Sequence, residues 1–357
     1  MKIRLLPTAV ALCATAVVSS GCAVVGPASI ANGRAAYTDV ITRTNDQQLL
    51  SMVVRMRYAE PSTLLQVTSI TAQSEVNVGA TGQVGVGPSS NYAGNLVPFA
   101  VTGGYRETPT ISYTPITGER YFKELLTPIE LDLYVLMVRA AADTRWMVEL
   151  LTDAVGPMDA PIYRPVPWEA SMHKAIELIA RLKDQNVLSF NFSVTDKGQI
   201  SGMHMVLCSA TQEQAAAVQE LLKLLGKEKA PKTGDTTTLT IQIGAEEEGP
   251  GVVRLQPRST MGLLQLATLG VDLPEEHLAN GIAAPLPQTA SRPFIHVKCG
   301  KEAPPDPMVA VAYRGYWFWV ESTDIPSKRG FNMLQMLLLR CLQDHNPPAP
   351  LLTLPIG

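Results

Sequence analysis

The first residue whose type and position suggest chemistry is Cys22. It follows a short basic start with Lys2 and Arg4, an apolar run over residues 5–18 and the small residues Ser19-Ser20-Gly21. This order of segments is typical of a secretory signal peptide. Cleavage directly before Cys22 would expose its thiol at the new N-terminus. Cleavage at another small residue, as in an ordinary secretory signal, is the alternative.

The segment that ends at Cys22 resembles the signal of a bacterial lipoprotein. The resemblance implies that residues 1–21 are removed and that the Cys22 thiol carries a diacylglycerol, so that membrane lipid is a partner. Each buried methylene contributes about 0.8 kcal/mol, and several acyl chains anchor a protein without a spanning helix. Ala23 stands where an aspartate would resemble an inner-membrane retention signal. We therefore expect a lipid-anchored outer-membrane protein that faces the periplasm.

The composition is that of a folded envelope protein. Removal of residues 1–21 takes away Lys2 and Arg4 and no acidic residue, which leaves 27 basic against 32 acidic residues, a formal charge of −5. Without a basic patch, we expect no nucleic-acid partner. After residue 22, no apolar run approaches the ~20 residues of a spanning helix. The remaining length is enough for two or three compact units.

Three short motifs invite comparison with acyl-enzymes. Ser171-Met-His-Lys174, Ser189-Phe-Asn191 and Lys232-Thr-Gly234 match S-x-x-K, S-x-N and K-T-G, and so resemble the motifs of penicillin-binding proteins and serine β-lactamases. That fold inserts a helical domain between the nucleophile and the last motif, whereas here all three fall within residues 171–234. The last motif also lies in a predicted loop rather than a strand. We expect no catalytic residues of this kind.

The histidines and cysteines give no metal-binding pattern. The sequence contains no H-E-x-x-H motif. His296 and Cys299 stand three apart in a predicted strand, so they would point to opposite faces. We expect no metal and no cofactor. For Cys208, Cys299 and Cys341, two alternatives stay open: one disulfide with one free thiol, or three buried thiols.

One aromatic strand is a candidate ligand site. Trp317 and Trp319 would share one face of a strand, and Arg314 lies just before it. Such a face could form a platform for a sugar or for peptidoglycan. An aromatic strand that is simply half-buried in the fold is the alternative.

An unusually long alternating segment begins at Val67. Polar and small apolar residues alternate for about twenty residues, a strand signature, whereas ordinary strands have ~5–6 residues. A turn-rich stretch at residues 88–91 and a second alternating run follow, which predicts one hairpin over residues 65–114. Its candidate interface residues are Val76, Val78, Val84, Val86, Val97, Phe99, Val101 and Tyr105.

The remaining pattern predicts an α+β fold, in which the long N-terminal β-hairpin with helices precedes a mixed antiparallel sheet and helices. We predict helices from near Asn45 to residue 60, over 118–126, 128–155, 169–184 and 211–226, from a Ser259 cap to about 269, and from a Ser327 cap onward. Strands are predicted near 188–195, 202–208, 237–244, 252–257, 293–299, 308–313 and 316–322. The predicted divisions are a signal peptide (1–21), a lipid-anchored tether (22–44), helix, hairpin and helices (45–160), an α+β middle region (161–285), a C-terminal hairpin and helix (286–346) and a proline-rich tail (347–357).

Two further regions resemble a group of uncharacterised proteobacterial envelope lipoproteins. They are residues 43–50 with 108–115 and 118–119, and residues 313–319 with 324 and 327–328. The resemblance covers most of the mature chain and implies no particular activity. Residues 320–323 replace a more acidic run of that group.

These observations predict a non-enzymatic outer-membrane lipoprotein that acts as a structural or assembly component of an envelope complex. Its partners would be copies of itself or other envelope proteins, paired through the hairpin. One alternative is a subunit of a multimeric outer-membrane β-barrel pore or secretion channel, to which each copy contributes the 65–114 hairpin. A second is an envelope hydrolase or a peptidoglycan- or glycan-binding protein.

Overall fold

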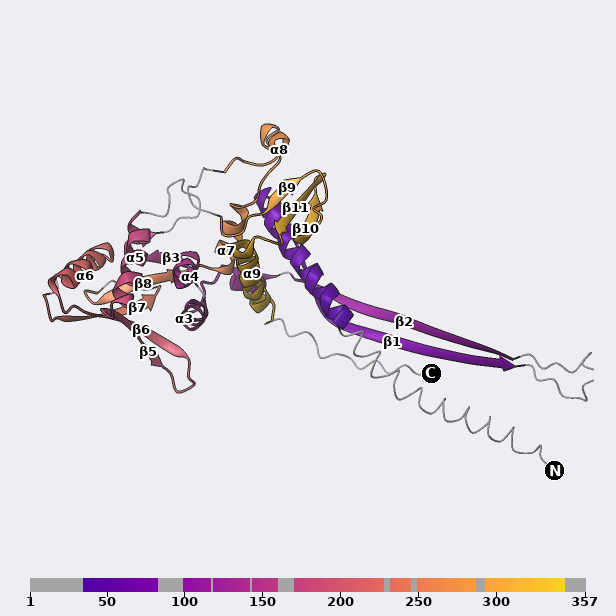
Figure 1. Ribbon diagram of the computed structural model, residues 1–357, viewed down its shortest axis with the longest axis horizontal. Helices are drawn as coiled ribbons and strands as arrows, with labels where there is room; N and C mark the ends of the chain where they lie inside the picture. Colours follow the sequence, from indigo (N-terminus) through magenta and orange to yellow (C-terminus); the bar gives the residue numbers. More distant parts are fainter. Residues whose placement is uncertain are drawn as a thin grey trace, which may run out of the picture. The chain divides into compact units, whose positions relative to one another are not determined.

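The computed structural model describes residues 35–82, 99–116, 118–141, 143–159, 170–227, 232–244, 249–286 and 293–343 (Figure 1). Helices and separate sheets make up the fold, so the predicted α+β class is confirmed. The chain divides into two compact units, Met1–Ser62 with Phe122–Cys341 and Thr63–Tyr121 with Leu342–Gly357. Each unit is described by itself.

The first unit opens with a helix over residues 35–57. Leu49, Leu50, Val53 and Val54 recur at helical spacing and are almost completely buried, which explains why this half was predicted. The predicted start near Asn45 is wrong, because residues 35–44 are already helical. These earlier turns are exposed or half-buried, so the sequence has no apolar stripe there to indicate a helix.

The first unit contains a six-stranded sheet in the order β4-β3-β8-β7-β6-β5. Its neighbours are antiparallel except for the parallel pair β7–β8. Alternate residues are buried, as in Met203, Met205 and Leu207 of β6, so one face of the sheet lies against the core. The strands are β3 (Thr152–Val155), β4 (Met158–Asp159), β5 (Leu188–Val194), β6 (Ile200–Cys208), β7 (Thr236–Ile243) and β8 (Val252–Pro257).

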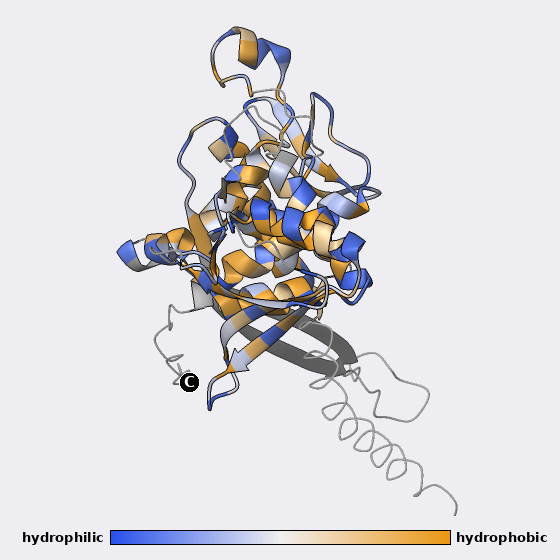
Figure 2. Ribbon diagram, turned by 90° about the vertical axis from the view of Figure 1, so that its left-hand side faces the viewer, coloured by the Kyte–Doolittle hydropathy of each residue, from blue (hydrophilic) through white to orange (hydrophobic). Residues whose placement is uncertain are grey.

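Four helices belong to this sheet: α3 (Leu131–Ala140), α4 (Thr144–Leu151), α5 (Ala170–Asp184) and α6 (Gln212–Leu224). In Figure 2, hydrophobic and hydrophilic stretches alternate along the helices, as expected where one side is buried. The single helix predicted over 128–155 is wrong. The Asp143 carboxylate accepts a hydrogen bond from the Trp146 backbone N–H at 3.1 Å and starts a new helix. Residues Thr152–Val155 then pair with β8 as a strand.

The rest of the first unit contains a small antiparallel sheet of order β10-β11-β9. Its turn, Arg314-Gly315, has positive φ at both residues, 48° and 81°, as a tight hairpin requires. The predicted Ser259 cap is confirmed, since its hydroxyl accepts from Gly262 N–H at 3.1 Å. The elements are α7 (Thr260–Thr268), α8 (Glu275–Ala279), β9 (Lys298–Gly300), β10 (Pro307–Tyr313), β11 (Tyr316–Glu321) and α9 (Ile325–Gln343).

The predicted Ser327 cap of the last helix is wrong. Helix α9 begins at Ile325, and the Asp324 carboxylate accepts from the Ser327 N–H at 3.3 Å and from its hydroxyl at 2.7 Å. Asp324 is thus the capping residue and Ser327 lies in the first turn. Within the described residues, no helix is both long enough and apolar enough to cross a membrane.

The second unit contains β1 (Leu64–Gly82) and β2 (Phe99–Ile116), which pair antiparallel as a two-stranded sheet. Helix α2 (Glu119–Leu126) follows β2, and its residues from Phe122 onward belong to the first unit. The register sets Val76 opposite Tyr105, Val78 opposite Gly103 and Ala80 opposite Val101. The predicted interface residues Val84, Val86 and Val97 lie outside the described residues, together with the connection between the strands. One continuous hairpin over 65–114 therefore stays a prediction, as do the domain boundaries.

Candidate functional site

Strand β11 separates two chemically different faces of the small sheet. Phe318 and Val320 are completely buried, so the even-numbered residues face the core. Trp317 and Trp319 lie on the other face because successive side chains in a strand alternate. Both indoles are half-buried. The structure thus places these two predicted site residues on one face, away from the core.

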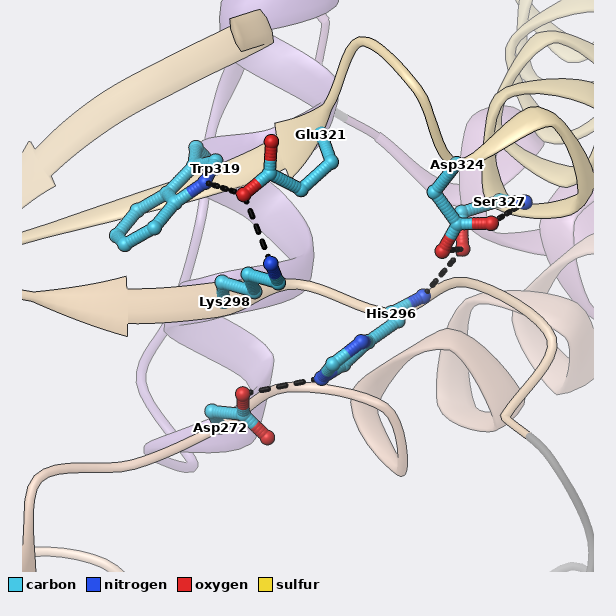
Figure 3. Close-up of polar contacts among 7 residues, drawn as sticks. All are labelled: Asp272, His296, Lys298, Trp319, Glu321, Asp324 and Ser327. Atoms are coloured by element: carbon cyan, nitrogen blue, oxygen red, sulfur yellow. Dashed lines mark hydrogen bonds and ion pairs between the residues drawn. The ribbon is translucent and has the colours of Figure 1, made fainter. Parts of the chain in front are cut away.

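The outer face also carries a fixed ion pair (Figure 3). Lys298 in β9 stands directly opposite Trp319, and its Nζ lies 2.8 Å from Glu321 Oε1. The same oxygen accepts a hydrogen bond from the Trp319 indole N–H at 3.1 Å. The bond from Lys298, which has the larger effect, and the bond from Trp319 both lower the pKa of Glu321. The carboxylate therefore holds both an ammonium group and an indole in place.

The flanking positions on the outer face are small. Gly300 stands opposite Trp317, and a methyl group added at Gly300 would lie only 3.2 Å from the Trp319 ring. On the other side, Ala312 pairs with Trp317 and Ala310 with Trp319. Small residues therefore face both indoles from β10 and face Trp317 from β9, whereas Lys298 faces Trp319 from β9.

The opposite, inner face packs against an aromatic cluster that includes Tyr58 and His277. The Tyr58 hydroxyl lies 2.7 Å from His277 Nδ1, and both side chains are buried. Tyr58 also makes edge-on ring contacts with Tyr313 and Phe318. Burial raises the pKa of Tyr58 to about 12, so its phenol stays protonated and acts as a hydrogen-bonding group rather than a nucleophile.

Arg314, the third predicted site residue, belongs to the edge of this aromatic cluster. Its guanidinium forms an ion pair with Glu60, which also accepts a hydrogen bond from the Tyr313 hydroxyl. The hydrogen bond from Tyr313, which has the larger effect, and the one from Arg314 both lower the pKa of Glu60. Arg314 thus links the β10–β11 turn to the end of the 35–57 helix, and its charge is already paired.

Ser327, His296 and Asp272 have the residue types of a catalytic triad but not its geometry. His296 Nε2 lies 3.0 Å from Asp272 Oδ2. The Ser327 hydroxyl accepts from the His296 backbone N–H at 2.9 Å and donates to Asp324, as Figure 3 shows. A triad needs the serine hydroxyl on the imidazole. This network joins the start of α9 to the segment before β9 and does not activate a nucleophile.

The other chemical candidates are also engaged in structural contacts. Lys174 of the S-x-x-K motif pairs with Glu220, and the Lys232 loop is a turn in which Gly234 N–H bonds Ser209 O at 2.8 Å. Among the described residues, no three metal-ligating side chains come together.

The three thiols are free. Cys208 is exposed, Cys299 is half-buried and Cys341 is buried. Neither open alternative, a disulfide or three buried thiols, matches this arrangement.

Several residues of the two faces were not foreseen from the sequence. Glu321 has a weak local signal, because it follows Trp319 at the strand period of two. Lys298 and His277 have none, since their positions depend on which distant strands and helices pair. Comparison of this chain with known protein families, with curated proteins and with solved structures gives no match in any of the three.

Proposed function

We propose that this chain is a non-enzymatic outer-membrane lipoprotein, anchored through acylated Cys22, that acts as a structural or assembly component of an envelope complex. Copies associate through strands β1 and β2. The signal-like layout of residues 1–22 supports the anchor.

The observation that carries the proposal is the length and isolation of the β1–β2 pair. The strands have 19 and 18 residues, against ~5–6 for ordinary strands. They form a two-stranded sheet, so within the described residues each strand has one partner and one open edge. An open edge of this length offers a row of backbone donors and acceptors to another chain. Two strands alone are also only marginally stable in water, so a partner would stabilise them.

The register of β1 and β2 supports a second contact surface besides the open strand edges, namely one apolar face of the strand pair. Ile70 stands opposite Ile111 and Ala80 opposite Val101, whereas Thr71 stands opposite Thr110. Directly opposite positions share a face, so most apolar positions of the two strands coincide, with the pair Ser74–Glu107 as a polar interruption. A slip by one residue would exchange the two faces. The apolar face is therefore a consistent surface for a second copy.

A pair of matched variants tests the association. Val78→Lys changes the face with apolar positions, and Asn77→Lys places the same charge on the other face of β1. The full-length lipidated protein is purified in detergent and its mass measured by light scattering. We expect a multimer for the unchanged protein and for Asn77→Lys, and a smaller particle for Val78→Lys and for deletion of residues 76–104. A monomer throughout would contradict the proposal.

The anchor is tested separately, by growing cells with a radioactive fatty acid. Label is expected in the unchanged protein and not in Cys22→Ala, which should also leave the membrane fraction. Unlabelled wild-type protein would contradict the lipid anchor while leaving strand pairing open to its own test.

The pore alternative is favoured by the same strand lengths, because each exceeds the ~9–11 residues of a membrane-crossing strand. It predicts ring-shaped particles in electron micrographs and ion conductance in reconstituted vesicles. The assembly role would be favoured if the Cys22→Ala multimers leave the membrane fraction and if vesicles reconstituted with the unchanged protein show no ion conductance.

A further inference from the structure

The outer face of the β9–β10–β11 sheet is the surface whose chemistry the assembly role does not use. It presents Trp317 and Trp319 side by side, about 7 Å apart along the strand by ordinary strand geometry. Gly300 and Ala312 face Trp317, and Ala310 faces Trp319 from β10, so these neighbours leave room beside the rings, while Lys298 faces Trp319 from β9. Ala312 is exposed and the others are half-buried.

The polar groups beside the indoles are preorganised. Glu321 holds Lys298 at 2.8 Å and the Trp319 N–H at 3.1 Å. The Lys298 and Glu321 side chains are nevertheless 43% and 33% exposed, so each keeps hydrogen-bonding capacity toward solvent. Aromatic side chains with a few precisely placed polar groups recur in the lining of small-molecule sites.

From this juxtaposition we propose that Trp317, Trp319, Lys298 and Glu321 form a saccharide-binding surface that takes the glycan strand of peptidoglycan. The apolar ring faces of successive sugars lie on the indoles, and their hydroxyl and acetamido groups bond Lys298 and Glu321. The sheet supplies the rigid support that such a platform needs.

The charge balance selects the kind of glycan. Lys298 is neutralised by Glu321, so this ion pair offers no surplus positive charge to the phosphate groups of a lipid-linked saccharide. A neutral polymer of N-acetylated sugars needs none. The proposed surface belongs to the first unit, whereas β1 and β2 belong to the second. The periplasmic location assumed for the glycan rests on the proposed function.

The test uses the full-length lipidated protein in detergent and two probes. Purified peptidoglycan sacculi report binding by co-sedimentation, and a β-1,4-linked tetramer of N-acetylglucosamine reports it by tryptophan fluorescence and by competition with the sacculi. Lipopolysaccharide serves as the second saccharide source. We expect the protein to sediment with sacculi and to be displaced from them by the tetramer. We expect its binding to lipopolysaccharide to be weaker than its binding to sacculi.

Two kinds of variant separate binding from folding. Trp317→Ala and Trp319→Ala remove the platform, and truncation of a central tryptophan in a binding surface commonly weakens binding by about tenfold or more. Ala312→Gln leaves both indoles in place and covers the exposed position opposite Trp317. We expect the same loss from it with unchanged thermal unfolding. Trp146→Phe, next to Phe294 at 6.0 Å between ring centroids, is the matched control and should bind normally.

The proposal is overturned if the unchanged protein stays in the supernatant, if the tetramer does not compete, if lipopolysaccharide binds instead, or if the folded platform variants bind as well as the unchanged protein. Failure here is distinguishable from failure of the assembly role. The platform variants should keep the multimer mass, and Val78→Lys should keep sacculus binding.

Discussion

Tyr58 and His277 lie 219 residues apart in the chain, and the Tyr58 hydroxyl is 2.7 Å from the His277 Nδ1 atom. The neighbouring residue Arg57 donates to the Ala284 carbonyl oxygen at 2.8 Å. The last residue of the 35–57 helix and the residue after it thus contact the segment beyond α8 and α8 itself. The 35–57 helix is thereby tied to α8, whose His277 ring in turn contacts Tyr316 of β11 at 5.2 Å between ring centroids.

Loss of the Tyr58 hydroxyl should destabilise the protein. In Tyr58→Phe the ring contacts stay, but the buried imidazole of His277 loses its partner. An unsatisfied buried polar group costs about 1–3 kcal/mol, and chemical denaturation should show this decrease in the free energy of unfolding. Thr127→Val is the control, because it removes an exposed hydrogen bond from the Thr127 hydroxyl to the Lys123 carbonyl oxygen. It should change the free energy of unfolding little. Equal effects of the two variants would contradict the buried contact.

Removal of the buried Arg258 side chain should be more damaging. Arg258 is 2% exposed, donates to Leu150 O at 3.0 Å and pairs with Asp153 at 2.8 Å. Arg258→Ala removes a buried side chain with its packing and leaves the Leu150 carbonyl oxygen without this donor, while Asp153, 37% exposed, stays solvated. The lost buried hydrogen bond alone costs about 1–3 kcal/mol, so Arg258→Ala should lower the melting temperature strongly. Arg340→Ala breaks an exposed pair with Glu130 and should cost about 0–1 kcal/mol. A small effect of Arg258→Ala would show that the site is wetter than the structure indicates.

Asp46 should make stability depend on pH. Burial raises its pKa above the ordinary 3.8, opposed by a hydrogen bond from Gln335. A raised pKa means that the folded state binds the proton more tightly than the unfolded state. The resulting stabilisation is complete below about pH 3.8 and is lost as the pH rises through the folded-state pKa. Unfolding free energies across this range should therefore show Asp46→Asn gaining stability over the unchanged protein toward neutral pH. The exposed Asp39→Asn is the control, and a gain that does not depend on pH would contradict the assignment.

Gly270 should tolerate no side chain. An added methyl group would lie 1.9 Å from the Ile295 carbonyl oxygen, so the backbone would have to move. The Gly270 carbonyl oxygen accepts from Val297 N–H at 2.8 Å, and this contact would be lost with the movement. We expect Gly270→Ala to unfold at markedly lower temperature, whereas Gly251→Ala, which has open space around it, should stay close to the unchanged protein. Similar melting temperatures for both variants would refute the close packing.

Prediction from the sequence succeeded where a local pattern was sufficient. Met203, Met205 and Leu207 alternate as a half-buried strand and form one in β6, and Ser259 caps the helix that follows it. It failed over residues 128–155, where apolar character continues through a helix end, a new cap at Asp143 and a strand. Continuous hydrophobicity does not distinguish these elements, because buried helices and buried strands are equally apolar.

The candidate site divides in the same way. That Trp317 and Trp319 share a face follows from the strand period of two, and the anchor prediction at Cys22 likewise depends only on neighbouring segments of sequence. The pairing of Trp319 with Lys298, of Arg314 with Glu60 and of Tyr58 with His277 came only from the tertiary structure. Each of these contacts joins residues from different elements, and the choice of partner depends on how the elements pack, which alternation and capping within one segment do not encode.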